Sequence, residues 1–277
     1  MQTGETTTSV LHIENTHAHT RNDAVAIEMP VSLEFNGIAH AVMLASPIDI
    51  EDFAFGFALT EGIIDGANQI YDIQIQPEKQ GVIVKLEIAN SCFARLKVKR
   101  RQLAGTTGCG ICGAESLDHV LRPIQTMTPP ERQLSTHTVQ AILRTLDSHQ
   151  TLQHTTGATH AAAWFNQKGE LKLLREDIGR HNALDKVIGA SMRQSNPERP
   201  TGPIVVTSRA SMEMVQKALI AKTRYLIALS APTSLAIELA KQNGLCLIGF
   251  ARNHAFNVYS HADYLSHIPI ESTTANI

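Results

Sequence analysis

Two cysteines in a glycine-rich loop are the residues of this 277-residue chain best suited to covalent chemistry. Cys109 and Cys112 lie in the segment Gly108-Cys109-Gly110-Ile111-Cys112-Gly113. Glycine permits positive φ angles and close approach of another backbone, so such a loop leaves its thiols accessible. The thiolate is the reactive form of cysteine. The segment therefore favours a nucleophilic thiol that carries sulfur between two partners.

Three other interpretations of the cysteine pair stay open at this point. A structural zinc site usually has four ligands, and the sequence contains no second Cys-x-x-Cys. A thioredoxin-type redox pair expects a strand before it and a helix that opens at the first cysteine, whereas glycines occupy those positions here. A purely structural pair is the third alternative. Sulfur relay is the favoured hypothesis among the four.

A basic run leads into the cysteine loop. Its residues are Arg95, Lys97, Lys99, Arg100 and Arg101. It is either a solvated face or a source of positive field that favours a thiolate and attracts phosphate.

The remaining cysteines and a central histidine are expected to be structural. Cys92 and Cys246 have no close cysteine neighbour in sequence, and free cysteine often packs as a small buried hydrophobe. His160 lies in an apolar stretch and is interpreted as a core histidine. Zinc deaminases carry His-x-Glu, but position 162 is Ala162, so deaminase chemistry is not supported.

Polar side chains follow three expected strands at the points where helices begin. Those suited to binding an anion are Arg180, His181, Ser208, Arg209 and Ser211. Helix N-termini bind phosphate through their free N–H groups, although simple helix capping is the alternative. None of these junctions carries Gly-x-Gly-x-x-Gly or a Walker loop. We expect a crevice for a nucleotide at this edge of a sheet.

A fourth segment closes the last long strand. It comprises Phe250, Ala251, Arg252, Asn253, His254 and Ala255. Phe250 is suited to stacking on a base, and Arg252 or Asn253 to reaching the polar edge of that base.

Hydrophobic periodicity predicts an α/β protein. Residues 1–22 lack apolar periodicity and are expected to be a flexible tail, with order beginning near Val25. Residues 23–104 form an α+β unit whose first hairpin turns at Asn36-Gly37. Residues 105–157 hold the cysteine loop and connecting helices. In residues 158–270, alternating strands and helices predict a mixed, mostly parallel sheet with helices on both faces.

Composition narrows the class of protein. Hydrophobic residues make up 43% of the chain and the formal net charge is −2. A broad positive field for nucleic acid is therefore not expected. The N-terminus does not resemble a secretory signal, and no apolar run is long enough to cross a bilayer. We expect a cytoplasmic protein with reduced cysteines.

Taken together, these segments resemble the FdhD family of formate dehydrogenase accessory proteins, from about Ala26 to Tyr264. The resemblance rests on the cysteine loop and on several ordered motifs. The other motifs are Asn36-Gly37-Ile38, Glu51-Asp52-Phe53, Thr60-Glu61-Gly62, Thr159–Ala163, Glu176–Lys186, Ser208–Ser211, Glu213–Lys217 and Ser230–Pro232.

The resemblance implies a sulfurtransferase that takes persulfide sulfur from a cysteine desulfurase. The acceptor is the molybdenum bis(molybdopterin guanine dinucleotide) cofactor of formate dehydrogenase. Cys109 is then the persulfide carrier and Cys112 its partner, and Phe250–Ala255 matches the cofactor-binding stretch. Members often have arginine where this chain has Ala255, and Arg252 is expected to compensate. The resemblance also implies a cytidine deaminase-like C-terminal fold without the zinc site, and a homodimer.

Overall fold

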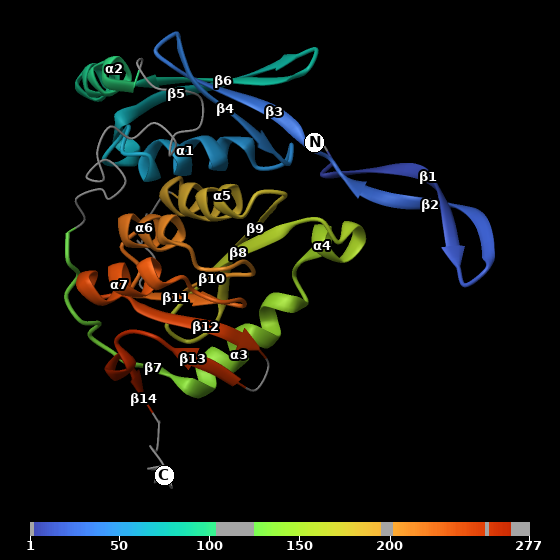
Figure 1. The fold of residues 1–277 in the computed structure, drawn as a ribbon. Helices are drawn as coiled ribbons and strands as arrows, with labels where there is room; N and C mark the ends of the chain where they lie inside the picture. The colour runs from blue at the N-terminus through green and yellow to red at the C-terminus, as the bar shows by residue number, and fades with distance from the viewer. Residues whose placement is uncertain (1–2, 104–124, 195–201, 253–254, 267–277) are drawn as a thin grey trace, which may run out of the picture.

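The structure, a computed structural model, describes residues 3–103, 125–194, 202–252 and 255–266. These residues stack in layers (Figure 1). An N-terminal sheet covers a helix, further helices lie beneath it, and a second sheet and one more helix complete the stack. Every site discussed below depends on how the two sheets are joined through the helices between them.

The N-terminal sheet has the strand order β4-β3-β6-β5. Its strands are β3 (Met29–Phe35), β4 (Ile38–Ala45), β5 (Ile70–Glu78) and β6 (Gly81–Ile88). Asn36 and Gly37 join β3 to β4 with φ angles of 46° and 76°. Both residues tolerate positive φ, so the predicted hairpin is confirmed. A 3₁₀ turn, Ala67–Gln69, precedes β5.

Two helices close the core of this unit, α1 (Ile50–Thr60) and α2 (Asn90–Leu103). Phe53 and Phe57 of α1 pack against the buried face of β3. Gly62, with φ of 65°, follows the end of α1. The sequence Ser46-Pro47 with Asp49 has the pattern of a helix N-cap, but the interpretation of Ser46 as the cap of α1 is wrong. The cap position belongs to Asp49, and the Ser46 hydroxyl instead accepts a hydrogen bond from the backbone N–H of Ile178, at 3.2 Å.

Helix α1 lies against α5 (Arg180–Met192), which belongs to the C-terminal part of the chain. A Cβ atom built on Gly56 of α1 would lie 1.8 Å from the carbonyl oxygen of Asp185. One built on Gly189 of α5 would lie 1.9 Å from the carbonyl oxygen of Asp52. The two helices therefore touch through their backbones, which only glycine allows at these positions.

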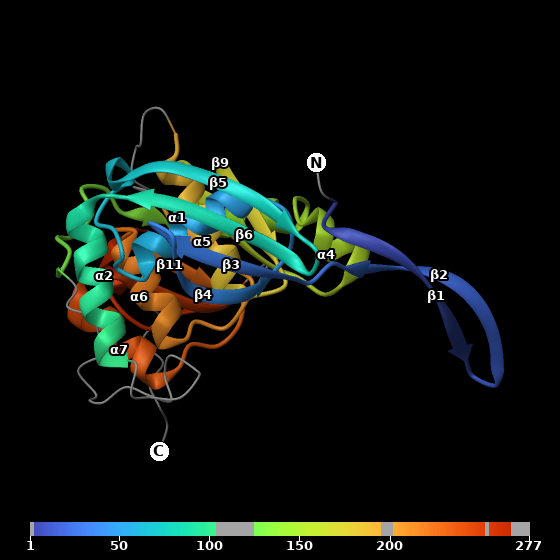
Figure 2. The same ribbon diagram turned by 90° about the horizontal axis from the view of Figure 1, so that it is seen from above.

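The expectation of an unstructured tail is wrong for residues 5–22. Strands β1 (Glu5–Glu14) and β2 (His17–Ala26) form an antiparallel hairpin that turns at Asn15, with φ of 54°. It projects away from the layered body (Figure 2). Most of its side chains are exposed, including Leu11 and Ile13. Because neither face is covered, the pattern of one buried face that signals a strand is missing.

The C-terminal sheet has six strands in the order β13-β12-β11-β10-β8-β9. They are β8 (His160–Phe165), β9 (Leu171–Asp177), β10 (Ile204–Val206), β11 (Tyr225–Ala228), β12 (Cys246–Arg252) and β13 (Ala255–Val258). Only β10–β11 and β11–β12 pair in parallel, while the other three neighbouring pairs are antiparallel. A mixed sheet is confirmed, but the expectation of mostly parallel pairing is wrong, because hairpins add β8 with β9 and β13 at the edges.

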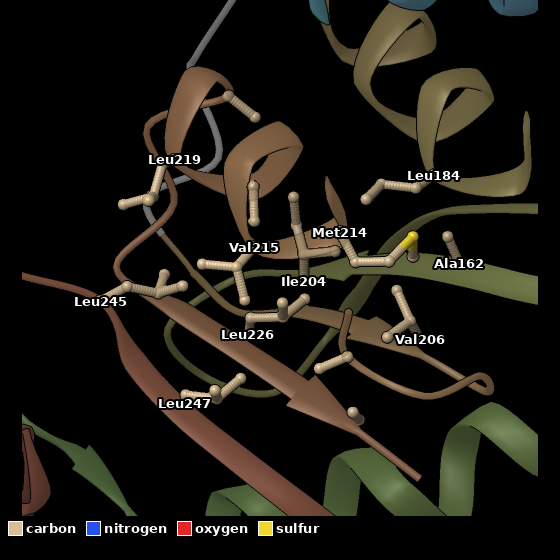
Figure 3. Close-up of a cluster of buried hydrophobic side chains, with 14 of the residues drawn as sticks. Ala162, Leu184, Ile204, Val206, Met214, Val215, Leu219, Leu226, Leu245 and Leu247 are labelled. Atoms are coloured by element: carbon tan, nitrogen blue, oxygen red, sulfur yellow. The ribbon is translucent and has the colours of Figure 1, made fainter. Parts of the chain in front are cut away.

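Helices cover both faces of this sheet, as predicted. On one face lie α5, α6 (Met212–Ile220) and α7 (Ser234–Asn243), whose apolar side chains interlock with those of β10 and β11. Val215 lies there beside Leu226, while Met214 points towards Leu184 and Ala162 (Figure 3). On the other face lies α3 (Thr136–Asp147). The sheet is therefore buried on both sides.

Short elements complete the described chain. They are α4 (Thr151–Thr156), β7 (Leu134–Ser135), β14 (Leu265–Ser266) and a 3₁₀ turn at Ala262–Tyr264. Cys92 and Cys246 are buried and unpaired, as expected. Within the described ranges, no helix combines the length and the apolar composition needed to span a bilayer.

Candidate functional site

The candidate site lies at one edge of the C-terminal sheet. Strand β9 is antiparallel to β8, and β8 is antiparallel to β10, so β9, β10, β11 and β12 all run in the same direction. Their carboxyl ends therefore meet at one edge, where ligands bind in open α/β sheets. The strand-to-helix junctions identified in the sequence converge there.

Three helices begin at this edge without a capping side chain. The cap residues Gly179 of α5, Ser211 of α6 and Thr233 of α7 make no side-chain hydrogen bond to their helix N-termini. By contrast, Ser135 caps α3 by accepting a hydrogen bond from the backbone N–H of Thr138, at 3.0 Å. Uncapped N–H groups and the helix dipole favour negative charge. The edge is therefore suited to phosphate groups.

Arg180 and His181 begin α5 and are both half-buried. Arg180 Nε and His181 Nε2 are buried atoms without a hydrogen-bond partner among the described residues. Buried polar atoms are normally satisfied, so these two atoms lack the partner that such groups usually have. Burial, followed by the charges of Arg180 and Lys217, lowers the pKa of His181 to about 4. His181 is therefore neutral near pH 7.

His181 should make folding stability depend on pH. Between about pH 6.5 and 4 the unfolded chain takes up a proton that folded His181 does not bind, so the free energy of unfolding falls as pH drops through this range. Urea denaturation at a series of pH values checks this. The slope should be shallower in a His181→Asn variant, and equal slopes in the two proteins would contradict the assignment.

The serines and the arginine at the start of α6 take different positions. Ser208 is buried and its hydroxyl donates to the carbonyl of Arg209, at 3.0 Å. Ser211 donates to Oε2 of Glu213, at 2.7 Å. Arg209 is exposed. Ser208 is thus less accessible than predicted, whereas Arg209 and Ser211 lie at the surface of the edge.

The end of β12 presents an aromatic side chain to solvent. Phe250 is 47% exposed and has a φ of 51°, a backbone region that bulky residues rarely adopt. Its N–H donates to the carbonyl of Ser230, at 3.1 Å. A Cβ on Gly249 would lie 2.8 Å from Pro232. The close approach of β12 to the loop before α7 therefore holds Phe250 in this strained, exposed position.

Of the other predicted site residues, the structure describes Ala251, Arg252 and Ala255. Ala251 is buried in the core beneath the sheet, so its side chain faces away from the edge. Arg252 and Ala255 are exposed and pair across the β12–β13 turn. Cys109, Cys112, Asn253 and His254 lie outside the described residues.

Comparison with known proteins assigns the family. Residues 26–266 match the FdhD/NarQ family. The chain belongs to the FdhD/NarQ family. A Variovorax paradoxus relative, named sulfur carrier protein FdhD, is 52% identical over 91% of this chain and 90% of its own. A Bordetella petrii relative of the same name is 49% identical, with 90% and 88% covered.

A solved structure shares the fold. It is a crystal structure of a putative formate dehydrogenase accessory protein from Desulfotalea psychrophila. It aligns with a TM-score of 0.71 and 23% identity, and covers 94% of this chain and 99% of its own. The mixed α/β architecture described above is therefore shared with a solved structure.

The motif Glu176–Lys186, part of the FdhD resemblance, contains buried residues that form ion pairs and two half-buried residues at the start of α5, Arg180 and His181. Asp177 forms an ion pair of 2.6 Å with Lys186, and both side chains are fully buried. Asp185 binds Lys217 at 2.9 Å and accepts a hydrogen bond from Thr60, at 2.8 Å. These residues join the two parts of the chain. Arg180 and His181 take no part in these ion pairs.

Glu176 has a separate structural role. Its carboxylate accepts hydrogen bonds from the backbone N–H groups of Leu152 and Gln153, at 2.8 and 2.7 Å. It therefore caps the start of α4 from another part of the chain.

Glu213 is a site residue that the sequence analysis did not single out. Its Oε2 lies 3.8 Å from His181 Nε2. Burial raises the pKa of Glu213, but hydrogen bonds from Ser211 and the helix backbone, together with nearby positive charge, outweigh burial and bring that pKa below its usual value. The sequence placed Glu213 in one motif of the FdhD resemblance and in the first turn of an expected helix, but neither signal assigned it to the site.

Proposed function

We propose that this protein is a sulfur carrier that matures formate dehydrogenase. It accepts persulfide sulfur from a cysteine desulfurase on Cys109 and transfers that sulfur to molybdenum bis(molybdopterin guanine dinucleotide). The observation that carries this proposal is the identity of 49–52%, over about nine-tenths of both chains, to relatives named sulfur carrier protein FdhD. The glycine-flanked thiols of Cys109 and Cys112 supply the chemistry that such a role needs.

The first step is a thiol exchange in which atoms and charge balance. The Cys109 thiolate attacks the outer sulfur of the desulfurase persulfide. A new sulfur–sulfur bond forms on Cys109, the old one breaks, and the desulfurase cysteine leaves as a thiolate. Cys112 follows Cys109 by three residues in the sequence. Attack of its thiolate on the inner sulfur of loaded Cys109 would release hydrosulfide and form a disulfide that protects both thiols.

The edge of the C-terminal sheet is suited to holding the acceptor. The acceptor carries guanine nucleotide arms, and each arm presents a pyrophosphate and a base. The uncapped starts of α5, α6 and α7 suit the phosphates. Arg180, Arg209 and Arg252 supply positive charge, and exposed Phe250 supplies a stacking surface. The acceptor enters as a substrate, and formate dehydrogenase receives it afterwards.

The proposal also includes the cellular compartment, the oligomeric state and the protein partners. The protein works in the cytoplasm, where its thiols stay reduced between turnovers, and it does so as a homodimer. Its partners are the desulfurase and formate dehydrogenase.

Mass spectrometry tests the carrier assignment. The protein is incubated with a cysteine desulfurase and cysteine, and its mass is measured intact and then again after digestion to peptides. We expect one added sulfur on the peptide that contains Cys109, and no added sulfur at that position in a Cys109→Ala variant. Cys112→Ala should still be loaded on Cys109.

A second readout separates sulfur transfer from cofactor binding alone. Formate dehydrogenase activity is measured in cells that lack the natural carrier and express each variant. Cys109→Ala should restore none of the activity. Full activity with both cysteines replaced would instead identify a chaperone that only holds the cofactor.

A further inference from the structure

Three histidines and a glutamate share one face of the β1–β2 hairpin, which projects from the layered body (Figure 2). In the antiparallel register, His12 lies opposite His19 and Glu14 lies opposite His17. Alternate side chains of a strand point to the same face, so these four residues form one block. The hairpin precedes nearly all of the region, residues 26–266, that matches the FdhD/NarQ family, and the proposed sulfur transfer does not use it.

The spacing of this block suits a single metal ion. Residues directly opposite each other in an antiparallel pair have Cβ atoms about 4.5–5.5 Å apart. Residues two positions apart along one strand are separated by about 6.5 Å. An imidazole ring or a glutamate carboxylate extends well beyond its Cβ atom, so ligand atoms from all four corners of the block can meet above its centre.

The rings of His12 and His19 have the spacing of two ligands of one ion. Their centres are 5.1 Å apart and their planes cross at 66°. Two imidazoles on a tetrahedral zinc ion have ring centres about 5 Å apart, because each Zn–N bond is about 2.0–2.1 Å long. The pair therefore needs no change in its separation to bind a metal.

The third histidine joins the pair by rotation of its side chain. Within the part of the chain that the structure describes, no three His, Cys, Asp or Glu side chains are yet arranged around a common point. His17 is exposed, so packing does not restrict its movement between rotamers. Glu14, which is also exposed, supplies a carboxylate oxygen as the fourth ligand.

The ligand types select the class of ion. Imidazole nitrogens suit zinc and neighbouring divalent transition metals, whereas Mg²⁺ and Ca²⁺ prefer oxygen ligands. We propose that His12, His17, His19 and Glu14 form a zinc site that joins β1 to β2. An isolated two-stranded hairpin is marginally stable in water, so an ion held by both strands would stabilise the projecting hairpin.

Isothermal titration calorimetry of the full-length protein with zinc chloride tests the site. The accessible thiols are alkylated first, because cysteine is itself a zinc ligand. One ion should bind per chain, and an excess of Mg²⁺ should not displace it. Failure of the alkylated protein to bind zinc would overturn the proposal. One ion per two chains would show that the ligands come from two copies, and would overturn a site within a single hairpin.

Single substitutions identify the ligands. His12→Ala, His17→Ala and His19→Ala should each weaken zinc binding by more than about tenfold, because loss of even an outer-shell partner costs about 10–100-fold in metal affinity. His137→Ala is the matched control, since His137 is an exposed histidine of α3 and should leave the affinity unchanged. Wild-type affinity in any one of the three hairpin variants would overturn the three-histidine set.

Hydrogen exchange followed by mass spectrometry reports on the hairpin directly. Zinc should slow amide exchange in peptides from residues 5–26, because strands joined by an ion open less often. In His19→Ala, the same peptides should exchange at one rate with and without zinc. Protection in another part of the chain, with residues 5–26 unaffected, would place the ion elsewhere and overturn the proposal.

Discussion

A Gly56→Ala substitution is expected to lower the free energy of unfolding by at least about 3 kcal/mol, the upper end of the cost of overpacking. In an ordinary helix the same change is stabilising by about 1 kcal/mol, so the sign of the effect is diagnostic. The added Cβ would lie 1.8 Å from the carbonyl oxygen and 2.9 Å from the Cα of Asp185. Both atoms are backbone and cannot rotate away.

The damage from Gly56→Ala should extend beyond the local contact. To accommodate the methyl group, α1 must move away from α5, and the same separation stretches the polar contacts between them. Asp52 binds Arg193 at 2.6 Å, and Thr60 binds Asp185 at 2.8 Å. These pairs help to join the two sheets through the helices between them. Once the pairs are stretched, the two parts of the chain should no longer unfold in one cooperative transition.

Urea denaturation followed by circular dichroism measures the effect of Gly56→Ala. Gly66→Ala is the control, since Gly66 has an extended φ of −169° and a new Cβ would meet only the side-chain end of Asn68. The control should lie within about 0.5 kcal/mol of wild type. A stable Gly56→Ala variant with one unchanged transition would show that the helices separate easily.

Local patterns in the sequence predicted most of the individual elements. Asn36-Gly37 marked a hairpin because both residues accept positive φ, and they do so in the structure. The apolar stretch that contains His160 forms strand β8, in which the residues from Ala161 to Phe165 are buried. These signals are carried by residues close together in the chain, and so they can be read without knowing the fold.

Partners distant in sequence could not be predicted in the same way. Ser46 resembled a helix cap, but its hydroxyl binds Ile178 and its N–H binds Asp177, at 3.0 Å. Asp185 lies in the polar motif Glu176–Lys186, and the carboxylate of Asp185 forms an ion pair with Lys217, which is distant in sequence. A polar residue near a helix start has the same sequence signature in both roles. Only the three-dimensional position of the partner distinguishes a cap, an ion pair and a ligand contact.

The candidate site was predicted in outline and not in its details. Shared strand direction placed Arg180, His181 and Arg209 at one edge, which needs only the order of strands and helices. Glu213 was not singled out because its position beside His181, at 3.8 Å, depends on how α5 and α6 pack in the fold. The roles of Cys109 and Cys112 stay predictions, as does the cytidine deaminase-like fold.

Loss of the buried carboxylate in Asp177→Ala is expected to lower the free energy of unfolding by about 3–5 kcal/mol, the cost of leaving a buried charge unpaired. Lys186 is fully buried, and Asp177 is its only acidic partner at 2.6 Å among the described residues. The ammonium group of Lys186 also donates hydrogen bonds to the carbonyl oxygens of Ser46 and Glu176, at 3.2 and 3.3 Å. Two neutral acceptors cannot replace a carboxylate.

Chemical denaturation of Asp177→Ala measures this loss, and a paired variant shows its cause. Asp177→Asn combined with Lys186→Met removes both charges while nearly preserving shape, so it should recover much of the lost stability. Equal stability of the single and double variants would show that the shape of Asp177, and not its charge, matters.

The pH dependence of Asp177→Ala should also differ from that of wild type. Burial already lowers the pKa of Lys186 against the opposing pull of Asp177. Without the carboxylate, Lys186 should shed its proton on folding, while the unfolded chain keeps that proton up to about pH 10.5. The unfolded state then binds more protons, so the free energy of unfolding should rise with pH more steeply than in wild type. A variant with the wild-type slope would mean that water reaches Lys186 and keeps it charged.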